Sequence, residues 1–206
     1  IGVVGIVASR IQKEYYRPTF ILGGSPEGMR GSGRSIKGFD LAAALRQCSN
    51  IINRHGGHAM AAGVSLDHDQ IDTFGERLNE IARGELSESL LAPTLRIDGE
   101  FPLSKLSMNI VTSLEALQPV GQGVPAVQLA VNNLEMNASV KWMGGEKQHA
   151  KMNVTDGKET VEVVFWNARG NSMPEGRFNL AVQPSINIWR STKSVQLKML
   201  DWEPSS

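Results

Sequence analysis

The sequence has a single cysteine, no long apolar run and no excess of charge of either sign. Because only Cys48 carries a thiol among 206 residues, an intramolecular disulfide is excluded and a reducing, cytoplasmic compartment is expected. No apolar stretch approaches the roughly 18 residues of a membrane-spanning helix, and the first residues lack a signal-peptide pattern, so we expect no membrane association. The 21 basic and 21 acidic side chains cancel, which means that any binding of nucleic acid must depend on local clusters of charge.

Hydrophobic residues make up 41% of the chain, which is enough to bury one large core or two small ones, and we favour two. The charges are sorted along the chain, with basic side chains predominant between Arg10 and Arg54 and acidic ones between Asp67 and Glu88. One face of the first half is therefore expected to be basic. Because position 1 is Ile rather than Met, we expect the chain to be a piece of a longer protein.

The first half predicts an α/β unit of about ninety residues, from its mixture of helical and strand-like apolar spacing. The expected helices cover 3–16, 40–52 and a stretch from Asp67 or Asp69 to just before Gly84, and the expected strands cover 19–22 and 29–36. Asp40 has the position of a helix N-cap, and Pro18 ends the first helix. The glycines of the second strand predict an edge strand or a strand that faces a ligand.

The second half predicts a small β-barrel. A polar stretch at 87–93 is expected to link the two halves, which gives predicted domains of 1–88 and 89–206. After a strand at 95–101 and a helix over 103–117, apolar residues alternate with polar ones in runs that begin near Leu134, Ala150, Val161, Leu180 and Val195. Asp156-Gly157 predicts a hairpin turn. Five or six short antiparallel strands of this kind are typical of an OB-fold that binds nucleic acid.

Two glycine-rich clusters in the first half indicate an anion site. The stretch 30–35 combines guanidinium groups, hydroxyls and exposed backbone N–H groups, and the stretch 55–63 places a glycine pair beside histidine, where the backbone can approach a ligand closely. The candidate substrate-binding residues are Arg30, Ser32, Gly33, Arg34, Ser35, Gly56, Gly57 and His58. The alternative is a tight turn into a buried element, with His58 as a core histidine whose hydrogen bonds are satisfied.

The predicted barrel offers a second candidate site. If alternate residues of the strand around Met152 point inward, then their neighbours point outward together with aromatic and basic residues near strand ends. The candidate nucleic-acid-binding residues are His149, Lys151, Trp166, Trp189 and Arg190. Aromatic and basic groups on one face would stack bases and hold phosphates of a single strand. The alternative is that the tryptophans pack in the core, as most do in a barrel of this size.

Several ordered motifs resemble the RecJ family of single-stranded-DNA-specific exonucleases. In the first half they are Gly5–Arg10, Tyr15–Thr19, Gly31–Ser35, Gly38–Leu41 and Gly56–Gly63, which are similar to the DHH-associated domain of that family. In the second half Leu117–Pro125 resembles the LxPxGxGxP segment, and Asn187–Arg190 resembles the end of the family's OB domain. The chain departs from the family at Val120, Val124 and Leu129, where Phe, Asn and Phe are more usual.

The resemblance implies an α/β DHH-associated domain followed by a mostly antiparallel OB-fold β-barrel, in a 5′-to-3′ exonuclease of DNA repair and recombination. RecJ enzymes use two Mg²⁺ or Mn²⁺ ions held by aspartates and histidines of an N-terminal DHH domain. No Asp-His-His and no cluster with metal-ligand spacing occurs in this sequence. The chain is therefore expected to hold substrate, to bind no metal or other cofactor, and to be inactive alone.

The resemblance also assigns roles to residues. Ser32 and Arg34 are implied to bind the 5′-terminal phosphate of single-stranded DNA, and Gly56, Gly57 and His58 to lie against the DNA backbone near the metals, with His58 as the catalytic residue of this chain. Single-strand-binding protein is a candidate partner.

Two other classes of function stay open. DHH-associated domains also occur in phosphodiesterases of short oligonucleotides or cyclic dinucleotides and in alanyl-tRNA editing proteins, but those lack this barrel. The other class is a non-catalytic module that binds single strands or a protein partner.

Overall fold

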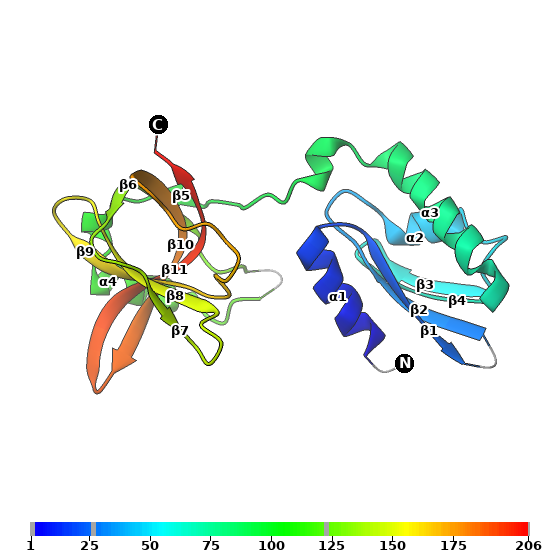
Figure 1. Cartoon of the computed structure of the whole chain (residues 1–206), viewed down its shortest axis with the longest axis horizontal. Coiled ribbons are helices and arrows are strands. Elements are labelled where there is room, and N and C mark those ends of the chain that lie inside the picture. The colour runs from blue at the N-terminus through cyan, green and yellow to red at the C-terminus, as the bar shows by residue number, and fades with distance from the viewer. Residues whose placement is uncertain (1–2, 26–27, 122–123, 206) are drawn as a thin grey trace. The chain divides into compact units, whose positions relative to one another are not determined.

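The chain divides into two compact units, Ile1–Thr94 and Leu95–Ser206, in a computed structural model that describes residues 3–25, 28–121 and 124–205 (Figure 1). The sequence predicts a boundary at 88, whereas a short 3₁₀ turn, Glu88–Leu91, and the residues up to Thr94 belong with the first unit. Among the described residues no helix has the length and apolar character needed to cross a membrane.

Within residues 3–25 and 28–94, the first unit is built on an antiparallel sheet. Its strands are β1 (Thr19–Ser25), β2 (Gly28–Arg34), β4 (Ala61–Leu66) and β3 (Arg54–His58), in that order across the sheet. β3 and β4 form a hairpin whose turn is Ala59-Met60. The two glycine-rich clusters of the sequence therefore lie in one sheet, on β2 and on β3, with β4 between them.

β2 lies inside the sheet, so of the two predicted alternatives the edge strand is wrong, and a strand that faces a ligand stays a prediction. Its glycines have a packing role: a Cβ atom at Gly31 would overlap the Leu22 side chain, and one at Gly33 would lie 2.5 Å from Phe20 Cε1. Because β2 is paired on both sides, its backbone amides are committed to the sheet. They do not form the cradle of exposed N–H groups that the sequence predicted.

Helices cover both faces of this sheet (Figure 1). α1 (Val4–Tyr15) packs on β1 and β2 from one side, while α2 (Leu41–Arg46) and α3 (Ile71–Glu85) lie on the other, with a 3₁₀ turn at His68–Gln70 before α3. The carboxylate of Asp40 accepts a hydrogen bond from Ala43 N at 2.9 Å, as its predicted role of N-cap requires. α2 is shorter than predicted, because the chain turns after Arg46, and α3 continues through Gly84.

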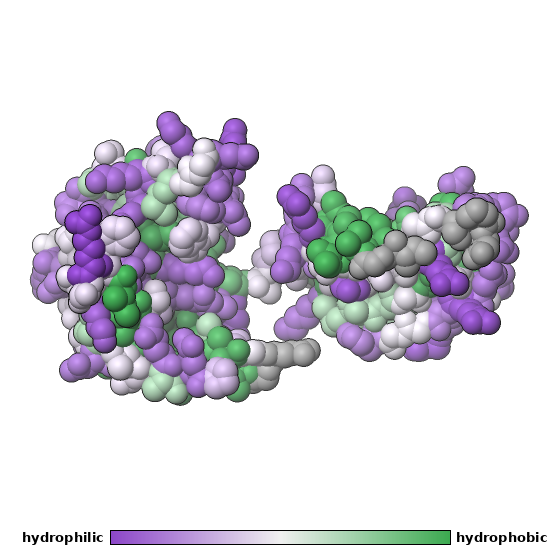
Figure 2. Space-filling view, turned by 90° about the horizontal axis from the view of Figure 1, so that it is seen from below, coloured by the Kyte–Doolittle hydropathy of each residue, from purple (hydrophilic) through white to green (hydrophobic). Residues whose placement is uncertain are grey.

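The core of the first unit lies between the sheet and the two helices α2 and α3. Val64 and Leu66 of β4 point into it and pack with Leu45 and Phe74. Cys48 is buried in the same core, and this burial raises the pKa of its thiol. The opposite face carries α1, where Ile6 and Val7, with Val3 just before the helix, form an exposed apolar patch (Figure 2).

Within residues 95–121 and 124–205, the second unit is strand-rich. Its strands are β5 (Gly99–Glu100), β6 (Leu129–Met136), β7 (Lys141–Met143), β8 (His149–Thr155), β9 (Thr160–Phe165), β10 (Arg177–Trp189) and β11 (Thr192–Pro204). β6, β10, β11, β9 and β8 pair in that order, and β8 pairs again with β6, so these strands form a ring. The pairings are antiparallel except for β9 with β11 and β5 with β6. The ring encloses a core that includes Val131, Met152, Phe178 and Leu197.

The turn predicted at Asp156-Gly157 joins β8 to β9. The Asp156 carboxylate accepts hydrogen bonds from the backbone N of Glu159 and of Lys158, at 2.8 and 2.9 Å, and these bonds lower its pKa. Gly157 has φ +90°, a conformation that glycine adopts without strain. The hairpin prediction is confirmed.

The start of the second unit is less regular than predicted. The expected strand at 95–101 is reduced to β5, and the expected helix over 103–117 consists of a 3₁₀ turn, Leu103–Lys105, followed by α4 (Met108–Glu115). Of the segment 117–125 that resembles a RecJ motif, Gln122 and Gly123 lie outside the described residues. Leu129, a departure from the family, is buried at the start of β6.

Candidate nucleic-acid interfaces

The strand register of the first unit gathers polar side chains into three rows on the face of the sheet that α1 partly covers, here called the outer face. Directly paired residues on neighbouring strands point to the same side of a sheet. One row holds Arg34, Ala61 and His58; the next holds Ser32, Gly63 and Gly56; the third holds Arg30, Ser65 and Arg54. Two segments that are far apart in sequence, 30–34 and 54–58, thus contribute to one polar surface.

Arg34 and Ser32 converge beneath the first turn of α1. A Cβ atom at Gly5 would lie 2.9 Å from Arg34 Nη2, so the glycine leaves room for the guanidinium, and the same Cβ position is 3.7 Å from Ser32 Oγ. Arg34 Nη1 also donates to Gly33 O at 2.8 Å, which helps to fix the guanidinium. A guanidinium, a hydroxyl and the first turn of a helix in one place form an arrangement that favours an anion.

His58 stands at the end of the edge strand β3, in the same row as Arg34. The two Cα atoms are separated by two strand spacings, roughly 10 Å. Its ring is exposed, and Nδ1 accepts a hydrogen bond from Met60 N at 3.3 Å, which in the neutral imidazole leaves the proton on Nε2 as a donor. His58 is therefore a surface donor, which excludes the alternative of a core histidine.

The turn that follows His58 is held in place by backbone hydrogen bonds. Ser35 N donates to Met60 O and Leu41 N donates to Ala59 O, both at 3.0 Å. These bonds attach the β3–β4 turn to the end of β2 and the start of α2. The position of His58 relative to Arg34 is thus fixed by the local fold of the first unit.

The barrel of the second unit carries a groove of about 890 Å³ on its outer surface. Four of the five predicted residues line it, namely Lys151, Trp166, Trp189 and Arg190. Trp166 is 47% and Trp189 70% exposed, and the Arg190 guanidinium lies 5.8 Å from the centre of the Trp189 ring. Since large aromatic side chains are costly to leave in water, two in one groove indicate a surface that binds flat groups such as bases.

Other residues of the barrel groove have partners within the chain. Lys151 Nζ pairs with Glu162 at 2.5 Å, and the other carboxylate oxygen of Glu162 accepts from Gln196 Nε2 at 2.6 Å. His149 does not line the groove; its ring packs edge-on against Trp166, with 4.8 Å between ring centres, and its Nδ1 accepts from Asn167 N. Lys151 is therefore less available to phosphates than the sequence predicted, and His149 supports Trp166.

The comparison with protein families agrees with this architecture. A model of the RecJ OB domain matches residues 97–201, just over half of the chain. The chain belongs to the RecJ family. A model of the DHHA1 domain, the DHH-associated domain, matches residues 2–84, so that each unit corresponds to one RecJ domain and the predicted fold class is confirmed.

RecJ proteins are similar along nearly the whole chain. The single-stranded-DNA-specific exonuclease RecJ of Bacillus subtilis is 33% identical over 205 residues, which cover 97% of this chain and 26% of that protein. RecJ of Escherichia coli is 30% identical over 212 residues, with coverage of 95% and 35%. The crystal structure of Thermus thermophilus RecJ in complex with Mn²⁺ has a TM-score of 0.82 at 25% identity and covers 100% of this chain and 29% of its own. The chain thus spans about a quarter to a third of the length of these proteins.

Some of the RecJ motif residues predicted to bind substrate have structural roles instead. Ser35 is 3% exposed, and its hydroxyl donates to Phe39 O at 2.6 Å, so it cannot reach a ligand on the outer face. Gly33 is buried against Phe20. Gly57 has φ +141°, and a Cβ atom there would overlap Ala61 O. The accessible members of the predicted set are Arg30, Ser32, Arg34, Gly56, Gly57 and His58.

Sequence reasoning missed two residues of this RecJ surface, Arg54 and Ser65. Arg54 shares the outer face with His58 because they are four positions apart on one strand, and Ser65 lies between Arg54 and Arg30. Period-two spacing around the glycine pair could have identified Arg54, but the pairing that brings it opposite Ser65 and Arg30 is not visible in the sequence.

The glycine pair Gly56-Gly57 tests which residues of the RecJ motif have a structural role. Gly57→Ala is expected to lower the opening free energy of the β3–β4 sheet by at least about 2 kcal/mol, because alanine is strained at φ +141° and overlaps the backbone. Gly56→Ala is the matched control: nothing lies within 4 Å of its Cβ, so a change below about 0.5 kcal/mol is expected. Hydrogen exchange at the amides of Gly63 and Ser65, which are paired with Gly56 and Arg54 of β3, measures both. Equal losses in the two variants would contradict a structural role specific to Gly57.

Proposed function

We propose that this chain is the substrate-holding part of a RecJ-like 5′-to-3′ single-stranded-DNA exonuclease. The observation that carries the proposal is the convergence of the Arg34 guanidinium and the Ser32 hydroxyl beneath Gly5, with His58 in the same row of an open sheet face. Arg34 and Ser32 would bind the 5′-terminal phosphate, and His58 a backbone phosphate. The RecJ OB match of the second unit favours this function over that of an oligonucleotide phosphodiesterase.

The divalent metals of the reaction would be supplied by a part of the enzyme outside this chain. The related Thermus thermophilus structures contain Mn²⁺ or Mg²⁺. In the described part of this chain, no three His, Cys, Asp or Glu side chains lie together in a way that could hold a metal ion. The residues present do not fit a two-metal site, so we assign this chain the binding and orientation of the strand.

The hydrogen-bond donors of Arg34 and His58 on the outer face are suited to binding phosphates. The planar fork of Arg34 can donate two parallel hydrogen bonds to one phosphate, and the dianionic 5′-phosphate gains more from this contact than a 5′-hydroxyl end. Nε2–H of His58 can donate to a phosphate oxygen, and a donor aimed at a phosphate can stabilise the charge that develops there in the transition state. Arg34 would thus select the end of the strand, and His58 would act on every substrate.

The barrel groove would bind the single strand by stacking, which Trp189→Ala tests in the chain as it stands. Since a stacked base contributes roughly 1–3 kcal/mol, we expect the affinity for a single-stranded oligonucleotide to fall by about fivefold to a hundredfold. Trp142→Ala is the matched control, because Trp142 is also exposed but does not line the groove. Fluorescence anisotropy at fixed salt, with single strand and duplex, measures the dissociation constants. Unchanged single-strand affinity in Trp189→Ala and Arg190→Ala would contradict the stacking proposal.

We further propose that the complete protein acts in the cytoplasm in DNA repair and recombination, with single-strand-binding protein as a candidate partner. The support is the reducing compartment expected from Cys48 and the similarity to RecJ exonucleases. Co-purification of the complete protein with single-strand-binding protein tests the partner.

A further inference from the structure

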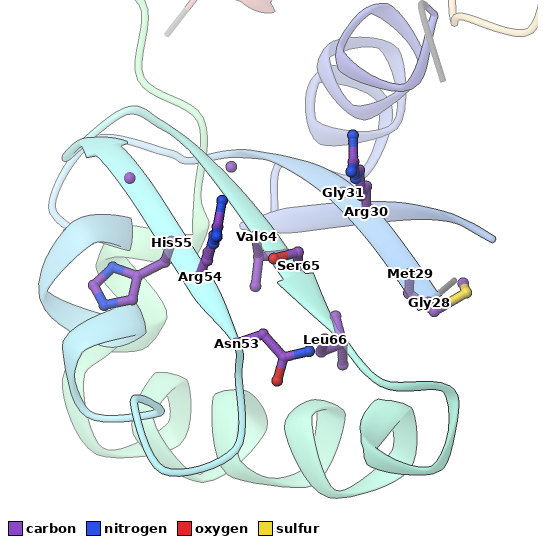
Figure 3. Close-up of a pocket in the computed structure, with 12 residues that line it drawn as sticks. Gly28, Met29, Arg30, Gly31, Asn53, Arg54, His55, Val64, Ser65 and Leu66 are labelled. Carbon is purple, nitrogen blue, oxygen red and sulfur yellow. The ribbon is translucent and has the colours of Figure 1, made fainter. Parts of the chain in front are cut away.

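The third row of the outer face lies in a depression of about 660 Å³ (Figure 3). Arg30 of β2 and Arg54 of β3 flank Ser65 of β4, and directly paired positions place all three on the same side of the sheet. Figure 3 shows the side chains of Arg30 and Arg54 on one side and that of His55 on the other. The depression continues over Gly56 and Gly63, which have no side chains to fill it.

Among the described residues, the positive charge of this row has no ion-pair partner. Arg30 and Arg54 are exposed, and neither forms an ion pair within residues 3–25, 28–121 and 124–205. The acid at the end of β4, Asp67, is hydrogen-bonded to the Asn53 amide at 2.9 Å. Two guanidinium groups on strands roughly 10 Å apart, with a hydroxyl between them, can share one anion.

The spacing of the rows matches a nucleic-acid backbone. Ser32 and Arg30 are two residues apart on β2, roughly 7 Å, which is comparable to the separation of neighbouring phosphates in an extended single strand. Gly56 and Gly63 lie between the row of Arg34 and the row of Arg30. Because neither has a side chain, a sugar-phosphate chain can approach the sheet closely there. Among the described residues no Phe, Tyr or Trp lines the depression, and the ring of His55 lies on the other side of the sheet from Arg30 and Arg54, so the row offers phosphate contacts and no stacking.

We propose that Arg30, Ser65 and Arg54 form a second phosphate subsite, which takes an internal phosphodiester of the DNA strand whose 5′-phosphate occupies Arg34 and Ser32. The inference rests on the proposed function and deepens it. The first unit then binds a strand at two places along β2 and β3, the end at one row and the backbone at another. The subsite contacts the phosphate and not the base, so its binding does not depend on the DNA sequence.

A length series of 5′-phosphorylated oligodeoxynucleotides, from one to five nucleotides, tests the subsite in the 206-residue chain. Dissociation constants are measured by following ¹H–¹⁵N shifts, with the amides of Gly63 and Ser65 as local probes. Arg54→Gln is expected to leave the mononucleotide affinity unchanged and to weaken binding about tenfold once internal phosphates are present. The salt slope for the longest oligonucleotide should also fall in magnitude by about 0.7, one phosphate contact.

Two further variants separate the possible outcomes. Arg34→Gln is expected to weaken binding by the same factor at every length, and Arg46→Gln on α2, an exposed arginine on the opposite side of the sheet, to change nothing. If Arg34→Gln weakens binding but Arg54→Gln has no effect up to five nucleotides, the second subsite is wrong and the proposed function stands. An equal effect of Arg54→Gln on the mononucleotide also overturns the subsite. If neither variant has an effect, the proposed function of this face fails as well.

Discussion

Replacing His58 by alanine is expected to lower kcat of the complete exonuclease, with a RecJ catalytic domain in the same polypeptide, by about 10²-fold or more. The reason is that Nε2–H of His58 is an exposed donor, because Nδ1 accepts the hydrogen bond from Met60 N, and the proposed function assigns a backbone phosphate to this donor. Every substrate has such a phosphate, so the loss should be equal on 5′-phosphorylated and 5′-hydroxyl single strands. Single-turnover rates with both ends measure the effect.

His55→Ala is the matched control for this experiment. His55 is also exposed on β3, but its side chain lies on the other side of the sheet (Figure 3), so we expect kcat to stay within about twofold of the unchanged protein. Because the His58 ring is exposed, its removal should hardly change the unfolding free energy, which separates a chemical effect from a folding defect. A kcat unaffected by His58→Ala would leave the histidine without a catalytic role.

Replacing Arg34 by alanine should abolish the preference for 5′-phosphorylated over 5′-hydroxyl ends in the same complete enzyme. The guanidinium beside Ser32 can form a bidentate, charge-assisted pair with a terminal phosphate, and a hydroxyl end lacks the dianion that this pair would bind. The ratio of kcat/KM for the two ends should therefore fall toward about one, mainly through loss of activity on the phosphorylated end.

Arg34→Lys sharpens the result, since lysine keeps the charge and loses the planar fork. We expect it to retain part of the end preference, because a point charge attracts the dianion without the paired geometry. If Arg34→Ala kept the full preference, the stretch 30–35 would not be the 5′-phosphate site. The glycines of β2 would then be explained by their packing against Leu22 and Phe20 alone.

The sequence by itself determined the kinds of elements, the two units and the family. Apolar spacing, the Asp40 cap and the Asp156-Gly157 turn are local signals, because they depend on residues within a few positions of each other. The ordered motifs, from Gly5 to Arg190, span nearly the whole chain, which is why the amino-acid sequence alone is enough to show the RecJ resemblance. Helix lengths were less well predicted, since tertiary packing decides where α2 ends.

Only the tertiary structure decided which motif residues are free to bind. Arg34 and Ser35 are neighbours in sequence, yet one lies on the outer face and the other is buried with its hydroxyl bonded to Phe39. Gly56 and Gly57 are both exposed, yet a side chain would fit at Gly56 and would overlap the backbone at Gly57, which has φ +141°. Strand pairing forms the row of Arg30, Ser65 and Arg54. It also forms the groove that Trp166 and Trp189 line. The physical reason is that strand register is a long-range property: a shift of one residue would turn each of these side chains to the other face of its sheet.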